Sequence, residues 1–171
     1  MKSKTKAHFL LVEDDDDHAE LVEFSMKNID GSNSLERVCN GKEAIAYLMR
    51  EAPFTDVKRP DVILLDLNMP MVNGHEVIKF AKSNPDFRTI PIVVLTTSNA
   101  EQDRIRAYQA HANSYVVKPL DFTLFQKLVS DLEEYWSQWN QSSSHDNSDH
   151  SQSGEIVHPS LDQNPPSRQA S

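Results

Sequence analysis

The sequence predicts an α/β protein in which helices cover both faces of an open parallel β-sheet. Short aliphatic and β-branched runs alternate along the chain with segments of helical periodicity, which is the pattern of βα units around a parallel sheet. Three of these runs are apolar throughout, as strands covered on both faces are expected to be. We therefore expect five strands and five helices.

The expected strands cover residues 8–12, about 35–39, 61–65, 91–95 and 114–117. Helix starts are indicated by a capping side chain three residues before an acid or amide, a spacing that satisfies free backbone N–H groups. It occurs at Asn40–Glu43, Ser98–Glu101 and Thr123–Gln126. Apolar residues at helical spacing follow the first of these signals and also occur between Leu21 and Ile29.

The last expected helix has the strongest amphipathic pattern. Its apolar stripe consists of Phe125, Leu128, Val129, Leu132, Trp136 and Trp139. Most of the stripe covers the sheet, but Tyr135, Trp136 and Trp139 extend past the end of a short covering helix. This cluster either folds over the domain's own core or forms an exposed patch that mates with a second copy or a partner. We favour the second alternative and predict an interface at these three residues.

Composition divides the chain at about residue 140. Residues 141–171 contain nine serines, three histidines and only three large aliphatic residues. Such a segment cannot bury enough apolar surface to offset its chain entropy, so we predict that it is a disordered polar tail. Residues 1–140 are the predicted folded domain.

Charge and hydropathy exclude several classes of protein. The formal net charge of the 171 residues is −9, which argues against a general nucleic-acid binder, since phosphate contacts need a basic face. No apolar run approaches the length of a membrane span, and the lysine-rich start leads into a strand rather than a secretion signal. Cys39 is the single cysteine, so an intrachain disulfide is excluded. We expect a cytoplasmic protein without nucleic-acid or membrane partners.

Polar residues follow the carboxyl ends of four expected strands. They are Glu13–Asp14, Asp66, Thr96–Thr97 and Lys118. Ligands of an open α/β sheet bind beyond this edge. Carboxylates brought together there repel one another unless a cation lies among them, and Mg²⁺ prefers oxygen ligands. A lysine and a threonine hydroxyl beside them fit a phosphoryl group, whose charge they would stabilise.

The acidic run that begins at Asp14 has two parts. Asp15–Asp17 favour the N-terminus of a helix electrostatically, so only Glu13 and Asp14 are assigned to the metal site. At the other end of the set, Lys118 precedes Pro119. A cis Lys118–Pro119 bond, which an X-Pro sequence permits, would aim the ammonium into the site.

The residues above resemble the receiver domain of two-component response regulators, over roughly residues 7–139. The matching segments are Leu10–Asp14, Pro60–Pro70 with Gly74, Pro91–Thr96 and Tyr115–Pro119. The resemblance implies a flavodoxin-like (βα)₅ fold, a doubly wound parallel sheet with strand order 2-1-3-4-5.

The resemblance also implies metal and phosphate chemistry. By position, Asp66 resembles the phosphoacceptor. Glu13 and Asp14 resemble the acid pair that binds Mg²⁺ or Mn²⁺ together with Asp66, and the backbone carbonyl of Asn68 resembles a further ligand. The first acid is Glu13 where an aspartate is commonest. Its longer side chain leaves room for a bridging water, which makes Asp14 the surer direct ligand.

The remaining positions resemble the switch of the family. Lys118 resembles the phosphate-binding lysine, Thr96 the switch hydroxyl and Tyr115 the rotating aromatic. A finer resemblance is to the stand-alone response regulators paired with bacterial, especially cyanobacterial, phytochromes. It rests on the Glu-Asp pair, Leu65–Pro70, the long connection Met49–Arg59 and the aromatic last helix. That group typically dimerises through its last helix and strand face.

The function implied is a switch rather than an enzyme. A sensor histidine kinase, taken to be a phytochrome, donates a phosphoryl group to Asp66, and a homodimer signals by protein contact. One alternative is an intermediate relay that passes the phosphoryl group to another histidine. Two further alternatives are a Mg²⁺-dependent aspartyl-phosphate phosphatase and a pure interaction module. Asn68 argues against the phosphatase, which usually carries a second acid there, and the complete site argues against the module.

Overall fold

The computed structural model describes residues 6–27 and 33–141. Its elements are β1 (His8–Val12), α1 (Asp16–Lys27), β2 (Ser34–Val38), α2 (Gly41–Met49), β3 (Val62–Leu65), α3 (Gly74–Ser83), β4 (Ile92–Thr96), α4 (Glu101–Gln109), β5 (Ser114–Val117) and α5 (Phe122–Glu134), which continues into a π-helical turn at Tyr135–Trp139. Ile29 and the predicted disordered tail, apart from Gln141, lie outside the described residues.

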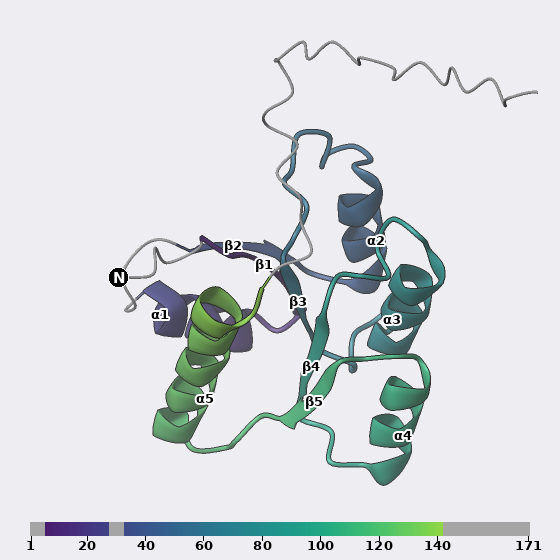
Figure 1. Ribbon diagram of the computed structural model, residues 1–171. Helices are drawn as coiled ribbons and strands as arrows, with labels where there is room; N and C mark the ends of the chain where they lie inside the picture. Colours follow the sequence, from purple (N-terminus) through teal and green to yellow (C-terminus); the bar gives the residue numbers. More distant parts are fainter. Residues whose placement is uncertain (1–5, 28–32, 142–171) are drawn as a thin grey trace, which may run out of the picture.

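The five strands form one parallel sheet in the order β2-β1-β3-β4-β5, which confirms the predicted fold class. Helices α1 and α5 cover one face of the sheet, and α2, α3 and α4 cover the other (Figure 1). Because the chain runs from β1 outward to both sides, the carboxyl ends of β1 and β3 flank the topological switch point where ligands of such sheets bind. No helix in the described ranges is both long enough and apolar enough to span a bilayer.

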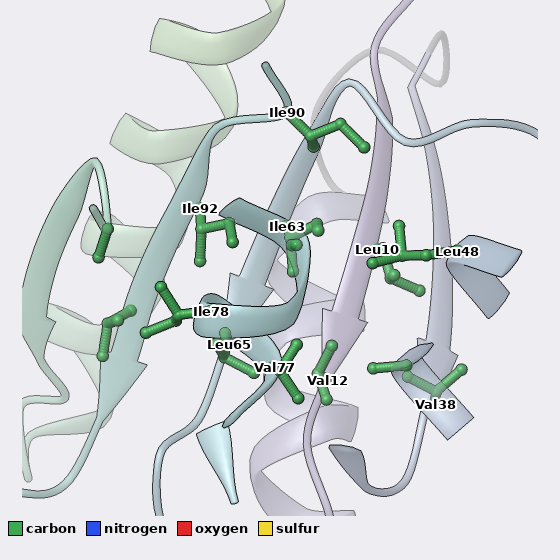
Figure 2. Packing of buried hydrophobic residues seen from close by; sticks show 14 of the residues in the cluster. Leu10, Val12, Val38, Leu48, Ile63, Leu65, Val77, Ile78, Ile90 and Ile92 are labelled. Atoms are coloured by element: carbon green, nitrogen blue, oxygen red, sulfur yellow. The ribbon is translucent and has the colours of Figure 1, made fainter. Parts of the chain in front are cut away.

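Two hydrophobic clusters, one on each face, explain why the central strands are apolar throughout. Successive side chains of a strand point to opposite faces. Leu10 and Val12 therefore pack against α2 and α3, as Figure 2 shows, whereas Phe9 and Leu11 pack against α1 and α5. Strands β3 and β4 alternate in the same way. Burying each large aliphatic side chain contributes about 1.5–3 kcal/mol to stability.

One of the three predicted helix caps is confirmed. The Asn40 side chain accepts from the Glu43 amide at 2.9 Å and starts α2. The caps predicted at Ser98 and Thr123 are wrong, because α4 follows Ala100 and α5 follows Asp121. The Asp121 carboxylate accepts from the Leu124 amide at 2.8 Å, so the chain enters α5 two residues earlier than predicted.

His8 lies in a buried polar network at the amino end of the sheet. Tyr47 donates to Glu36, so it accepts from Nε2 of His8 at 2.8 Å, and Nδ1 of His8 accepts from Ser34 at 2.7 Å. This arrangement requires a neutral imidazole with its proton on Nε2. Burial lowers the pKa of His8 below its ordinary value of 6.5, although Glu36 and Asp61 oppose the shift.

We expect this network to weaken in mild acid. The unfolded chain binds a proton at His8 before the folded protein does, so the stabilisation is complete above pH 6.5 and is lost as the pH falls from there through the folded pKa. The slope is at most about 1.4 kcal/mol per pH unit. Urea unfolding between pH 7.5 and 5.5 should show that the free energy of unfolding depends less steeply on pH in His8→Gln than in wild type. Parallel pH curves would contradict this assignment.

Candidate functional site

Backbone hydrogen bonds hold the strand-end residues in place. The amide of Asp66 donates to the Val12 carbonyl at 3.0 Å, and that of Glu13 donates to the Val38 carbonyl at 3.1 Å. The amide of Lys118 donates to the Thr96 carbonyl at 2.8 Å. Each bond continues the parallel ladder by one residue beyond the strand. The sheet therefore brings the predicted residues to one edge.

Three carboxylates form an acidic cluster at this edge. Glu13 is 1% exposed, Asp66 is buried and Asp14 is exposed. Each offers an oxygen, and the three oxygens lie within 4.8 Å of one another. An oxygen-only donor set that is partly open to solvent suits a small hard divalent cation that retains waters. These residues therefore fit the metal that the sequence predicts.

Lys118 provides the positive charge inside the cluster. Its Nζ lies 2.5 Å from Oε2 of Glu13 and 3.5 Å from Oδ2 of Asp66, and its side chain is only 2% exposed. Burial raises the pKa of Glu13, and the hydrogen bond from Lys118 opposes that rise. The Lys118–Pro119 bond, for which the sequence permits the cis form, is not cis: the cis peptide in the described ranges is Ala52–Pro53. The ladder bond to Thr96 holds Lys118 without it.

The structure distinguishes the two threonines at the carboxyl end of β4, Thr96 and Thr97. Thr96 is fully buried, whereas Thr97 is exposed. The Thr96 hydroxyl accepts from the Ser98 amide at 3.3 Å, and the Tyr115 hydroxyl donates to the Ser98 carbonyl at 3.0 Å. Burial raises the pKa of Tyr115. The segment from Thr96 to Ser98 thus connects the site with the Tyr115 ring on β5.

The loop after Asp66 is held close to the site by Gly74. Its amide donates to the Leu67 carbonyl at 3.2 Å. A Cβ at Gly74 would lie 2.5 Å from the Asp66 carbonyl oxygen, so only glycine lets α3 begin this near to the strand end. Asn68 is exposed, and its backbone amide donates to Oδ1 of Asp66 at 3.3 Å. Its carbonyl as a metal ligand stays a prediction.

Asp15–Asp17 lie at the N-terminus of a helix, as predicted, but the neighbouring His18 was missed. Asp16 and Asp17 lie in the first turn of α1, and Asp15 caps the helix by accepting from the His18 amide at 2.9 Å. Nδ1 of His18 lies 3.2 Å from Nζ of Lys118. The one sequence signal for His18 is its place in the first helical turn after the acid pair Glu13 and Asp14.

The predicted interface residues do not share one environment. Trp136 packs against the core cluster between the sheet and α1 and α5, with its indole N–H buried. Tyr135 and Trp139 are 52% and 71% exposed. Trp136 therefore folds over the domain's own core, which was the first of the two alternatives. An exposed patch that could meet another molecule is limited to Tyr135 and Trp139. Contact with a second copy stays a prediction.

Comparison with known proteins identifies the family. The sequence model of the response regulator receiver domain family matches residues 9–130 of this chain. The probable methanogenesis regulatory protein FilR2 of Methanothrix harundinacea is 41% identical over 134 residues, which cover 78% of this chain and 85% of the relative. Response regulator Rcp1 of Synechocystis is 39% identical over 127 residues, which cover 74% of this chain and 86% of Rcp1.

Solved structures agree with this assignment. The phosphorylated cyanobacterial phytochrome response regulator RcpA is 35% identical with a TM-score of 0.79, and the match covers 82% of this chain and all 100% of RcpA. The Mn²⁺-bound form of Rcp1 is 36% identical with a TM-score of 0.77, over 81% of this chain and 99% of Rcp1. The resemblance to phytochrome response regulators is confirmed at this level, and the chain belongs to the family of response regulator receiver domains.

Proposed function

We propose that this protein is a phosphorylation switch that accepts a phosphoryl group on Asp66 from a sensor histidine kinase. The observation that carries the proposal is the buried Lys118 ammonium, which lies between the carboxylates of Glu13 and Asp66 beside the Thr96 strand end. A lysine held there by burial has no surface role, and it is placed to meet a new anion on Asp66. Membership of the receiver family supports the same role.

Phosphoryl transfer needs one nucleophilic oxygen and compensation of charge. An Asp66 oxygen attacks the phosphorus of a phosphohistidine, the P–N bond breaks with its electron pair passing to the imidazole, and an acyl phosphate forms. A divalent cation held by Glu13, Asp14, Asp66 and the Asn68 carbonyl, Mg²⁺ or Mn²⁺, would neutralise charge on the transferring group. The Mn²⁺-bound form of Rcp1 supports this cofactor.

The response begins with the new charge on Asp66. The phosphoryl oxygens attract the Lys118 ammonium away from Glu13 and accept from the Thr96 hydroxyl, which then leaves the Ser98 amide. Movement of Thr96 opens space for the Tyr115 ring to turn inward, which changes the surface beside α4 and α5. A local charge event thereby biases a two-state element. The altered surface is read by a protein partner, so the product is a signal rather than a released substrate.

A phytochrome is the proposed kinase, because RcpA is a phytochrome response regulator and aligns over 82% of this chain. Since histidine kinases draw on ATP, the switch works in the cytoplasm. Phosphotransfer profiling against a panel of sensor kinases that includes a phytochrome tests the partnership, and we expect the phytochrome to transfer fastest. Faster transfer from another kinase would refute the phytochrome assignment. No transfer from any kinase, together with no labelling by a small acyl phosphate, would refute the switch itself.

We also propose that the protein forms a homodimer through its last strand and helix. Several large apolar side chains on or beside β5 and α5 are exposed: Val117, Leu124, Tyr135 and Trp139. Two copies that joined these surfaces would remove the apolar groups from water.

Trp139→Ser is expected to convert the dimer to a monomer in sedimentation at micromolar concentration, because Trp139 is the most exposed of these aromatic residues. Met49→Ser, which removes an exposed apolar side chain at the end of α2, should leave the dimer intact. A monomeric wild type, with and without a phosphoryl analogue, would refute the homodimer.

A further inference from the structure

We propose that His18 is a positioning residue that holds the Lys118 ammonium in place. The inference rests on the proposed function of the site and adds to it a residue outside the acids, the threonine and the lysine. His18 lies in the first turn of α1, 100 residues before Lys118 in the sequence, and Nδ1 of the imidazole is 3.2 Å from Nζ of the lysine. This is a side-chain contact between α1 and the end of β5.

The ammonium needs such a partner because it is buried. A lysine ammonium carries three N–H donors and no acceptor. Glu13 lies 2.5 Å and Asp66 lies 3.5 Å from Nζ, which leaves one donor without a carboxylate. The Lys118 side chain is 2% exposed, whereas that of His18 is 38% exposed. The imidazole nitrogen is the acceptor within reach of the third donor, so it takes the place that water has at an exposed lysine.

The backbone of His18 is held at the start of α1. Asp15 accepts from the His18 amide at 2.9 Å, and its own amide donates to Oε1 of Glu13 at 3.1 Å. These contacts form a closed ring of hydrogen bonds that runs from Glu13 through Asp15 and His18 to Lys118 and back to Glu13. The backbone position of His18 is thus linked, through Asp15, to the same acid that binds the ammonium.

A neutral acceptor is suited to this position. To accept from Lys118, Nδ1 must carry a lone pair, so the ring proton lies on Nε2. A third carboxylate would compete with a phosphoryl dianion for the ammonium, whereas a neutral ring orients the ammonium without offsetting its charge. His18 thus keeps Lys118 in position while the lysine exchanges Glu13 for a phosphoryl oxygen.

The experiment compares His18→Ala, His18→Asn and His18→Gln with wild type. The asparagine amide oxygen reaches the position of Nδ1, and the glutamine oxygen reaches that of Nε2. With Mg²⁺ and a small acyl phosphate, His18→Ala should take up phosphate about 5- to 10-fold more slowly, the factor that corresponds to one lost hydrogen bond worth about 1–1.4 kcal/mol. His18→Asn should recover to within about twofold of wild type, and His18→Gln should not. Glu20→Ala, at an exposed position of α1, is the matched control and should behave as wild type.

A second measurement does not depend on phosphorylation. The ¹⁵Nζ–¹Hζ signal of Lys118 reports how fast its ammonium protons exchange with water. Exchange should be slow in wild type, faster in His18→Ala and slow again in His18→Asn. An unchanged uptake rate and exchange rate in His18→Ala would overturn the inference. Slower uptake that asparagine does not restore would also overturn it, since it would indicate a general role in folding α1. If wild-type protein takes up no phosphate but the exchange pattern holds, the proposed function fails and the positioning of Lys118 stands.

Discussion

Asp66→Asn is expected to abolish phosphoryl uptake from both a sensor kinase and a small acyl phosphate. The amide keeps the size of the carboxylate but lacks its anionic oxygen nucleophile, so no acyl phosphate can form. The fold should be retained, because the change removes one of three like charges within 4.8 Å of one another. Intact mass after incubation with Mg²⁺ and the acyl phosphate measures the result as the presence or absence of one phosphoryl group.

The matched control is Asp17→Asn, an exposed acid in the first turn of α1 that lies outside the acidic cluster. It should gain the same phosphoryl group as wild type at a similar rate. Labelling of Asp66→Asn at the wild-type level would move the phosphoacceptor elsewhere in the chain.

Lys118→Met is expected to lower the free energy of unfolding by about 3–5 kcal/mol in metal-free buffer, since breaking a buried ion pair leaves an uncompensated buried charge. The lysine lies between Glu13 and Asp66, both of which are buried. Urea unfolding measures the effect. Lys127→Met is the control, because Lys127 pairs with Asp131 on the exposed face of α5, and such a pair is worth about 0.3–0.5 kcal/mol.

Two changes of condition should reduce the loss of unfolding free energy in Lys118→Met: a lower pH and added Mg²⁺. Burial already raises the pKa of Glu13, and the lysine is the group that opposes this rise. Without the lysine, Glu13 binds a proton more tightly in the folded protein than in the unfolded chain. The loss of unfolding free energy in Lys118→Met therefore decreases as the pH falls towards 4.5, the ordinary pKa of a glutamate. Added Mg²⁺ should also reduce it by replacing the missing cation. Equal stability of the lysine variants at positions 118 and 127 would show that the acids do not depend on Lys118.

The sheet could be predicted from local pattern because both of its faces are covered. Strands β1, β3 and β4 are fully buried, so their apolar runs are unambiguous. The edge strand β2 alternates exposed and half-buried residues, and its predicted bounds were correspondingly a residue late. The helix caps predicted at Ser98 and Thr123 failed because one nearby acid engages the Ser98 hydroxyl and another caps α5 in place of Thr123. The Ser98 hydroxyl donates to Asp103 at 2.6 Å, and Asp121 caps α5.

The site could be predicted to the extent that strand ends determine it. Glu13, Asp66, Thr96 and Lys118 each come directly after a strand or end one, and parallel strands bring them together. His18 could not be predicted, because its contact with Lys118 depends on how α1 packs beside the end of β5. The choice of Thr96 over Thr97 likewise needed the direction in which each side chain points.

Chemical trapping of the phosphorylated residue measures the proposed phosphoacceptor most directly. Borohydride reduces an aspartyl phosphate to homoserine, which peptide mass spectrometry locates after treatment with Mg²⁺ and a small acyl phosphate. We expect homoserine at position 66 alone, with Asp14, Asp15 and Asp61 unchanged. Homoserine at any of those acids, or its absence from a protein that has gained phosphate, would contradict Asp66 as the acceptor.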